Sequence, residues 1–160
     1  MRMLPPGRGA AGVSMSLAEL LVLEGHVDEA AREVALGLPM ASNTPAYRCV
    51  LLAVSSSIKL RRDDVAGALD DSARAMEYAA RAVAIGNAYT PCLARHEALR
   101  AAGMAEEARA VVREGAATLW RRAGNLGAYG PVYLEHGWRT AELMKLAVAE
   151  GVDPRTPATR

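Results

Sequence analysis

One eight-residue segment occurs twice in this chain, each time between two stretches with helical apolar spacing. Residues 23–30 read LEGHVDEA and residues 101–108 read AAGMAEEA, so Ala30 and Ala108 are 78 residues apart. The glycine is suited to end one helix, because it accepts a positive φ without a Cβ clash. The acidic pair is suited to open the next helix, since it faces the positive end of the helix dipole. The segment therefore predicts two antiparallel helices that pack closest at the alanine.

A weaker third copy lies between these two, at residues 60–68. It keeps Ala68 and a turn, but Arg62 stands in place of the glycine and Gly67 in place of the glutamate. The three alanines are then 38 and 40 residues apart. A period near forty residues that carries two helices and two turns is typical of an α-solenoid, in which each repeat packs on its neighbours.

Start and stop signals predict the helix boundaries. Ser16 and Glu19 have the spacing of a capping box, and Thr-Pro pairs at 44–45 and 90–91 combine an N-cap with proline at the first helical position. Pro39 is expected to stop a helix, and a loop is expected over 124–130. The fourth helix is expected to end at residues 85–87. About seven helices are thus predicted, beginning near Ser16, Val27, Pro45, Asp64, Pro91, Met104 and Trp138.

The pattern G-x-x-[D/E]-E-A at residues 25–30 and 103–108 resembles the tetratricopeptide family. The resemblance implies an all-α fold of antiparallel helix pairs, stacked as a short right-handed α-solenoid that binds proteins. The chain departs from the family pattern, because the usual large aromatic residues are missing and the period exceeds the family's length of about 34 residues. Residues 95–103, 106–109, 133–135 and 140–143 are similar to the C-terminal repeat region of large bacterial serine/threonine kinases and ATPase-type regulators.

The composition fits a single globular domain and argues against several classes of partner. Of the 160 residues, 51% are hydrophobic, 23% are charged and none is phenylalanine. The formal net charge of +1 gives no strong field for nucleic acid or an anionic membrane. No secretion signal and no membrane-spanning run is found, so a cytoplasmic location is expected. We expect a helical domain at 13–151, between flexible tails at 1–12 and 152–160.

No motif for catalysis or cofactor binding is found in the chain. A phosphate-binding loop, a dinucleotide fingerprint, the kinase signatures and a metal-ligating Cys/His cluster are all missing, so no cofactor and no metal are expected. Cys49 and Cys92 lie in apolar helical stretches and are expected as buried thiols. Cys92 and His96 share a helical face, which permits a thiolate–imidazole contact. One helical turn supplies neither oxyanion donors nor a third orienting group, so we expect that the chain is not an enzyme.

A partner surface is expected on the first helix of each pair, which lines the concave side of a solenoid. Arg48, Ser55 and Lys59 share one helix face, and Arg95 follows Ser55 by forty residues. These four residues form the predicted polar contact row for a protein or peptide. The predicted function is a non-catalytic protein-binding module, a regulatory or scaffolding element of a bacterial signalling system. The alternatives are a structural domain that self-associates as a homodimer or larger homo-oligomer, and a small helical ligand-binding protein or enzyme.

Overall fold

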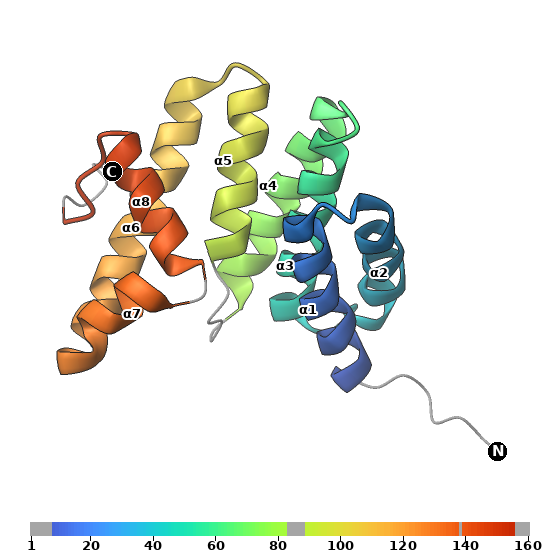
Figure 1. Ribbon diagram of the computed structural model, residues 1–160, viewed down its shortest axis with the longest axis horizontal. Helices are drawn as coiled ribbons and strands as arrows, with labels where there is room; N and C mark the ends of the chain where they lie inside the picture. Colours follow the sequence, from blue (N-terminus) through green and yellow to red (C-terminus); the bar gives the residue numbers. More distant parts are fainter. Residues whose placement is uncertain (1–7, 83–88, 138, 156–160) are drawn as a thin grey trace.

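The computed structural model describes residues 8–82, 89–137 and 139–155. Within these ranges the chain is helical and has no β-strand, which confirms the expected all-α class. The described residues form eight α-helices and one short 3-10 helix, against about seven helices expected. The elements are α1 (Arg8–Glu24), α2 (Val27–Met40), α3 (Pro45–Leu60), α4 (Val65–Arg81), α5 (Tyr89–Ala101), α6 (Ala105–Gly124), η1 (Gly127–Tyr129), α7 (Gly130–His136) and α8 (Thr140–Ala149) (Figure 1).

Successive helices form hairpins that lie side by side (Figure 1). α1 packs against α2, α3 against α4 and α5 against α6. α3 lies between α1 and α5, so these three first helices form one layer. α2 also contacts α3, and α4 contacts α5, so the second helix of a hairpin touches the first helix of the next. α7 and α8 pack mainly on α6, and α8 also reaches α5.

The three bends at the repeated segment share one backbone conformation. Gly25, Asp63 and Gly103 have φ angles of +89°, +60° and +78°. The residue after each bend donates its N–H to the carbonyl five positions earlier, which satisfies an orphan carbonyl of the preceding helix. These backbone hydrogen bonds run from His26 to Leu21 (2.8 Å), from Asp64 to Lys59 (2.9 Å) and from Met104 to Leu99 (2.9 Å). The residue in the glycine position of the middle copy is therefore Asp63, one position after the expected Arg62.

The structure also explains why the middle copy has Gly67 where the other two copies have glutamate. The Asp64 carboxylate caps α4 by accepting the N–H of Gly67 at 2.8 Å. A Cβ at position 67 would overlap that carboxylate, so glycine replaces the glutamate of the other two copies. The alanines of all three copies are fully buried, as expected for the closest approach of paired helices. These are Ala30, Ala68 and Ala108.

The first helix begins earlier than expected. α1 starts at Arg8, so residues 8–12, which were expected in a tail, are helical. Ser16 is an exposed residue in the middle of this helix and does not cap it. Glu19 is buried, with 3% of its surface exposed. The capping-box spacing of Ser16 and Glu19 therefore reflects one turn of a helix already formed, and residues 1–7 lie outside the described ranges.

Later boundaries differ from the prediction in four places. Pro39 lies within α2, which ends one residue later, and α5 begins at Tyr89, just before the Thr-Pro pair. The expected loop over 124–130 contains η1, and Gly130 opens α7, a helix that was not predicted. A Cβ on Gly130 would overlap the end of α6, so this glycine allows close packing instead of marking a loop. The predicted helix end at 85–87 lies outside the described residues.

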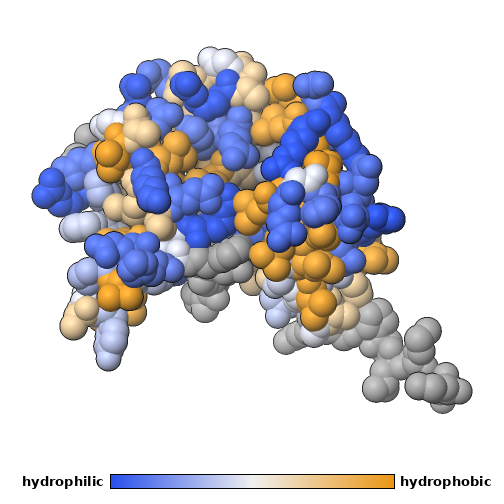
Figure 2. All heavy atoms as spheres, in the orientation of Figure 1, coloured by the Kyte–Doolittle hydropathy of each residue, from blue (hydrophilic) through white to orange (hydrophobic). Residues whose placement is uncertain are grey.

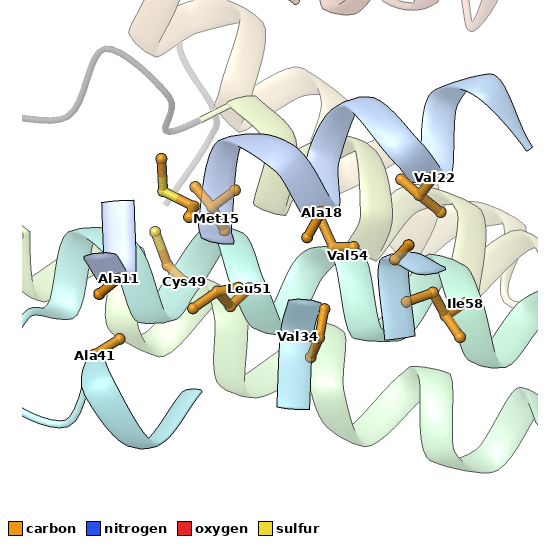
Figure 3. Close-up of a cluster of buried hydrophobic side chains, with 12 residues drawn as sticks. Ala11, Met15, Ala18, Val22, Val34, Ala41, Cys49, Leu51, Val54 and Ile58 are labelled. Atoms are coloured by element: carbon orange, nitrogen blue, oxygen red, sulfur yellow. The ribbon is translucent and has the colours of Figure 1, made fainter. Parts of the chain in front are cut away.

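Buried side chains form two main clusters. The first joins α1, α2 and α3, and its side chains are spread along the length of these helices (Figure 3). The second joins α5, α6 and α8. Val152 belongs to the second cluster and is buried, so the expected C-terminal tail begins as packed chain.

Candidate functional site

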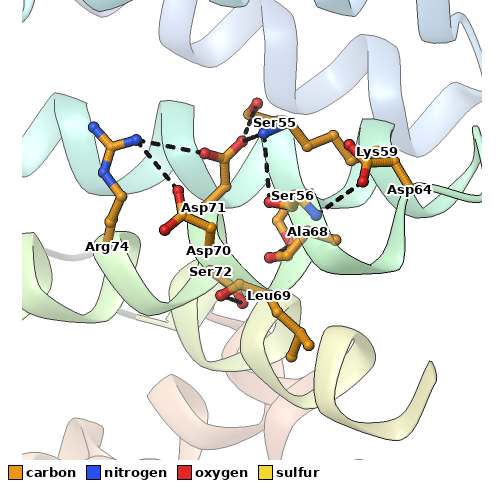
Figure 4. Close-up of polar contacts among 11 residues, drawn as sticks. Ser55, Ser56, Lys59, Asp64, Ala68, Leu69, Asp70, Asp71, Ser72 and Arg74 are labelled. Carbon is orange, nitrogen blue, oxygen red and sulfur yellow. Dashed lines mark hydrogen bonds and ion pairs between the residues drawn. The ribbon is translucent and has the colours of Figure 1, made fainter. Parts of the chain in front are cut away.

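Two residues of the predicted contact row are bonded to a buried aspartate of α4. Ser55 donates a hydrogen bond to the Asp71 carboxylate at 2.6 Å (Figure 4). Lys59 forms an ion pair with the same carboxylate at 2.7 Å. Only 5% of Asp71 is exposed, and such a charge is tolerated in the interior because it is paired and hydrogen-bonded. Ser55 and Lys59 therefore join α3 to α4.

The other two residues of the row also contact α4. Arg95 donates hydrogen bonds to the Leu69 carbonyl at 2.9 Å and to the Ser72 hydroxyl at 3.3 Å. The Arg48 guanidinium lies over the ring of Tyr78, 5.1 Å from its centre. All four predicted residues are half-buried and contact α4. The structure brings Ser55 and Lys59 together at Asp71. Arg48 and Arg95 contact other residues of α4.

Both thiols are buried and protonated at neutral pH. Burial raises the pKa of Cys49 to about 12. Burial, with a smaller effect of the Glu114 charge, raises the pKa of Cys92 to about 12. The thiolate is the nucleophilic form, so neither cysteine is activated. His96 places its Nε2 3.0 Å from a carboxylate oxygen of Glu150, which ties α5 to the end of α8.

A polar hollow of about 250 Å³ opens on the layer of first helices. Its lining comes from α1, α3 and α5, from the residue after α3 and from the residue before α8. Residues that are far apart in the sequence therefore meet there. Aliphatic side chains form part of the wall, and a hydroxyl, a carboxylate and two guanidinium groups form the rest. The lining residues are Val22, Leu23, Ser57, Leu60, Arg61, Glu97 and Arg139.

A buried polar cluster beside the hollow links the first and last helices. Glu19 of α1 accepts a hydrogen bond from the Thr90 hydroxyl of α5. Arg139 lies 3.9 Å from Glu19 and bonds both carboxylate oxygens of Glu142, at 2.9 and 3.0 Å. Arg139 has a φ of +55°, a conformation that costs energy for a residue with a side chain. Its ion pairs hold it there and fix its side chain at the edge of the hollow.

Glu97 is the one carboxylate among the residues that line the hollow. One carboxylate oxygen accepts a hydrogen bond from Ser57 at 3.4 Å, and Glu97 forms no ion pair with another described residue. Glu97 is exposed to solvent. Desolvation by neighbouring protein atoms raises the pKa of the Glu97 carboxyl, the charge of Arg139 opposes this rise, and the charge of Glu142 adds to it.

Sequence reasoning missed this hollow, although one signal for it was present. Glu97 follows Ser57 by forty residues, and the two side chains meet in the structure. The predicted row applied the same forty-residue shift to Ser55 and reached Arg95. That row lies two positions away on both helices, on the side that α4 covers. Amphipathic spacing alone could not show which side of α3 and α5 faces α4.

Apolar side chains are also exposed elsewhere in the described chain. Trp120 and Leu134 line a hollow of about 410 Å³ between α6 and α7. Val13, Leu17 and Leu20 are 67%, 41% and 46% exposed on α1, and Figure 2 shows hydrophobic side chains gathered over this helix. These areas lie near the first and last helices of the array.

No protein-family model, curated protein or solved structure matches the chain. In the described ranges, no helix has the length and apolar character needed to cross a membrane. Nor do those ranges contain a group of three or more His, Cys, Asp or Glu side chains placed to hold a metal ion.

Proposed function

We propose that this chain is a non-catalytic protein-binding module, a short tetratricopeptide-like α-solenoid that takes a protein or peptide on its layer of first helices. The observation that carries the proposal is the polar hollow on α1, α3 and α5. The concave surfaces of helical-repeat arrays are the usual place for partner capture. A regulatory or scaffolding role in bacterial signalling is the role that the resemblance to kinase- and ATPase-associated repeats implies.

The geometry of the bends supports a repeat-based reading of the fold. Gly25, Asp63 and Gly103 adopt the same conformation, make the same backbone bonds and precede an equivalent buried alanine. The contacts among α1, α3 and α5 place first helices next to each other, as repeat stacking requires.

The state of the thiols supports a binding role without catalysis. Cys92 and His96 were the nucleophile and base of the enzymatic alternative. Burial keeps the Cys92 thiol protonated, and His96 pairs with Glu150. A nucleophile without a base within hydrogen-bond reach lacks the activation that covalent catalysis needs.

Site-specific photo-crosslinking tests the proposal. Leu23 lies at the hollow and is 46% exposed, so a photoreactive residue there leaves the core intact. In extracts of the source cells, we expect this position to capture a defined protein that is not captured from Glu77, an exposed position on α4. Capture of the same proteins from both positions, or of none from Leu23, would contradict the proposal.

The exposed face of α1 favours self-association as a second candidate. Between Gly9 and Leu23 the helix has Glu19 as its only charged residue, and a helix that is apolar on all sides is normally buried. Val13, Leu17 and Leu20 are spaced four and then three residues apart, as in the apolar seam of a coiled coil. The same helix of a second copy would cover this seam.

Light scattering after size-exclusion chromatography tests self-association. We expect a concentration-dependent dimer for the native chain and a monomer for Leu17→Glu. Val148→Glu, which changes an exposed apolar residue of α8, serves as the control and should leave the dimer unchanged. A native chain that stays monomeric at all concentrations excludes this candidate.

A further inference from the structure

We propose that the hollow at Glu97 receives a lysine side chain of the bound partner. The inference rests on the proposed binding function and adds the chemistry of the residue that is recognised. The hollow combines an aliphatic wall with two oxygen acceptors at one place, and lysine combines an aliphatic stem with a compact ammonium group.

The shape of the hollow fits one long side chain. Val22, Leu23 and Leu60 supply an aliphatic wall for the four-carbon stem. Ser57 and Glu97 supply oxygens to the ammonium group, which has three N–H donors. The volume of about 250 Å³ lies below the roughly 300–1,000 Å³ of sites that enclose drug-sized molecules. A single side chain is therefore a better match than a whole small-molecule ligand.

Two guanidinium groups and one carboxylate line the hollow, but both guanidinium groups already have acceptors within the protein. Arg139 is already bonded to Glu142 and lies near Glu19. Arg61 donates to the Val22 carbonyl through its guanidinium group. An anionic ligand would therefore have to break existing bonds and approach Glu97. An ammonium group instead gains an ion pair with the one carboxylate of the hollow that has none among the described residues.

A peptide titration followed by NMR tests this inference on the full chain. The probe is an acetylated, amidated alanine pentapeptide with lysine at its centre, and the matched peptides carry norleucine or glutamate there. We expect saturable shifts of the Leu23, Ser57 and Glu97 amides with the lysine peptide alone. Glu97→Gln, which keeps the side-chain shape, should weaken binding about tenfold. Glu77→Gln, the same charge change on an exposed part of α4, should bind as the native chain does.

Each other outcome overturns the inference. Equal binding of the norleucine peptide would show that the charge is not recognised, and unsaturable shifts would show that no site exists. Equal weakening in Glu97→Gln and Glu77→Gln would reduce the effect to net charge. The amide spectrum of each variant shows directly whether it is folded. If crosslinking finds a partner at Leu23 while the lysine peptide fails, the proposed function stands and this inference falls.

Discussion

The two main buried clusters, one near each end of the chain, differ in the kinds of contact that stabilise them. In the first cluster, Met15, Leu51 and Val54 are buried among other aliphatic side chains of α1, α2 and α3 (Figure 3). In the second, the ring of Tyr89 is buried beside aliphatic residues of α6 and α8. Aliphatic packing has no preferred direction, whereas a buried hydroxyl must find a partner. The C-terminal end accordingly adds specific polar bonds to its aliphatic core.

Those bonds set the position of α7 and α8. The Tyr89 hydroxyl hydrogen-bonds with that of Tyr133 on α7, and the Thr140 hydroxyl donates to the Tyr133 carbonyl at 2.7 Å. Glu150 at the end of α8 pairs with His96 of α5. Arg139 directly precedes α8, and its bonds to Glu142 hold its side chain. The hollow thus combines Arg139, which polar contacts hold, with Val22 of the first aliphatic cluster.

The largest effects are expected from truncating one leucine in each cluster. Leu51 and Leu143 are both fully buried, so replacement by alanine should cost about 2–5 kcal/mol of unfolding free energy each. We expect Leu51→Ala to weaken the whole array, because α3 contacts helices on both sides. Leu143→Ala should instead loosen α8 ahead of the rest, since α8 packs on fewer neighbours. Denaturant titration gives the free energies, and native-state hydrogen exchange gives their distribution.

The conservative variants Leu51→Met and Leu143→Met serve as controls and should cost less than about 1.5 kcal/mol. Identical exchange profiles for the two alanine variants would remove the distinction between the ends. The array would then unfold as one cooperative unit, however its contacts differ.

The next largest effect is expected at the polar tie within the N-terminal end. Asp71→Ala removes the acceptor of Ser55 and the ion-pair partner of Lys59, which keeps only the Gly67 carbonyl at 3.4 Å, and this loss should cost about 1–3 kcal/mol. The neighbouring Asp70→Ala is a matched control, because Asp70 is exposed and only pairs with Arg74 at 3.6 Å. It should change the unfolding free energy by less than about 0.5 kcal/mol. Similar losses from both variants in denaturant titrations would show that burial of Asp71 has no energetic consequence.

Local backbone conformation could be predicted from the sequence, whereas the contacts between helices could not. Gly25 and Gly103 were interpreted correctly as bends, because positive φ is a local property that glycine alone accepts readily. The partner of Lys59 was not predictable in the same way, since it depends on which helix covers which face. Glu97 was missed for that reason, although its position is fixed by the same helical geometry. Gly130 led to the wrong prediction of a loop, because a glycine that allows close helix packing cannot be told from a loop glycine in the sequence.

A smaller effect is expected at the bends, where the two ends should behave alike. A Cβ at Gly25 or Gly103 would meet no other atom within 4 Å, so the cost of alanine there is the strain of the positive φ alone. Gly25→Ala and Gly103→Ala should each lose about 1 kcal/mol, and Asp63→Gly should gain up to about 1 kcal/mol. Thermal unfolding of the three variants gives the comparison. A large difference between the two glycine variants would place the asymmetry of the molecule in its bends rather than in its cores.

The smallest expected effects concern two glutamates whose pKa values move in opposite directions. The hydrogen bond from His96 lowers the pKa of Glu150, so this carboxylate stabilises the fold above its ordinary pKa and loses that effect as the pH falls through the lowered value. Desolvation by neighbouring protein atoms raises the pKa of Glu97, so the folded chain gains stability as the pH falls through the raised value. At neutral pH the charged Glu97 therefore opposes folding, whereas the charged Glu150 favours it.

Glutamine at each position should separate these two roles in melts at neutral and acid pH. We expect Glu150→Gln to lower the melting temperature at neutral pH and Glu97→Gln to raise it, by no more than about 2 °C. Both differences should shrink at acid pH, where the native carboxyls are protonated. A fall in both variants at neutral pH would show that Glu97 is an ordinary structural carboxylate. A rise in Glu97→Gln together with weaker capture of the lysine peptide would show a charge kept at a cost to stability, as is typical of residues retained for binding.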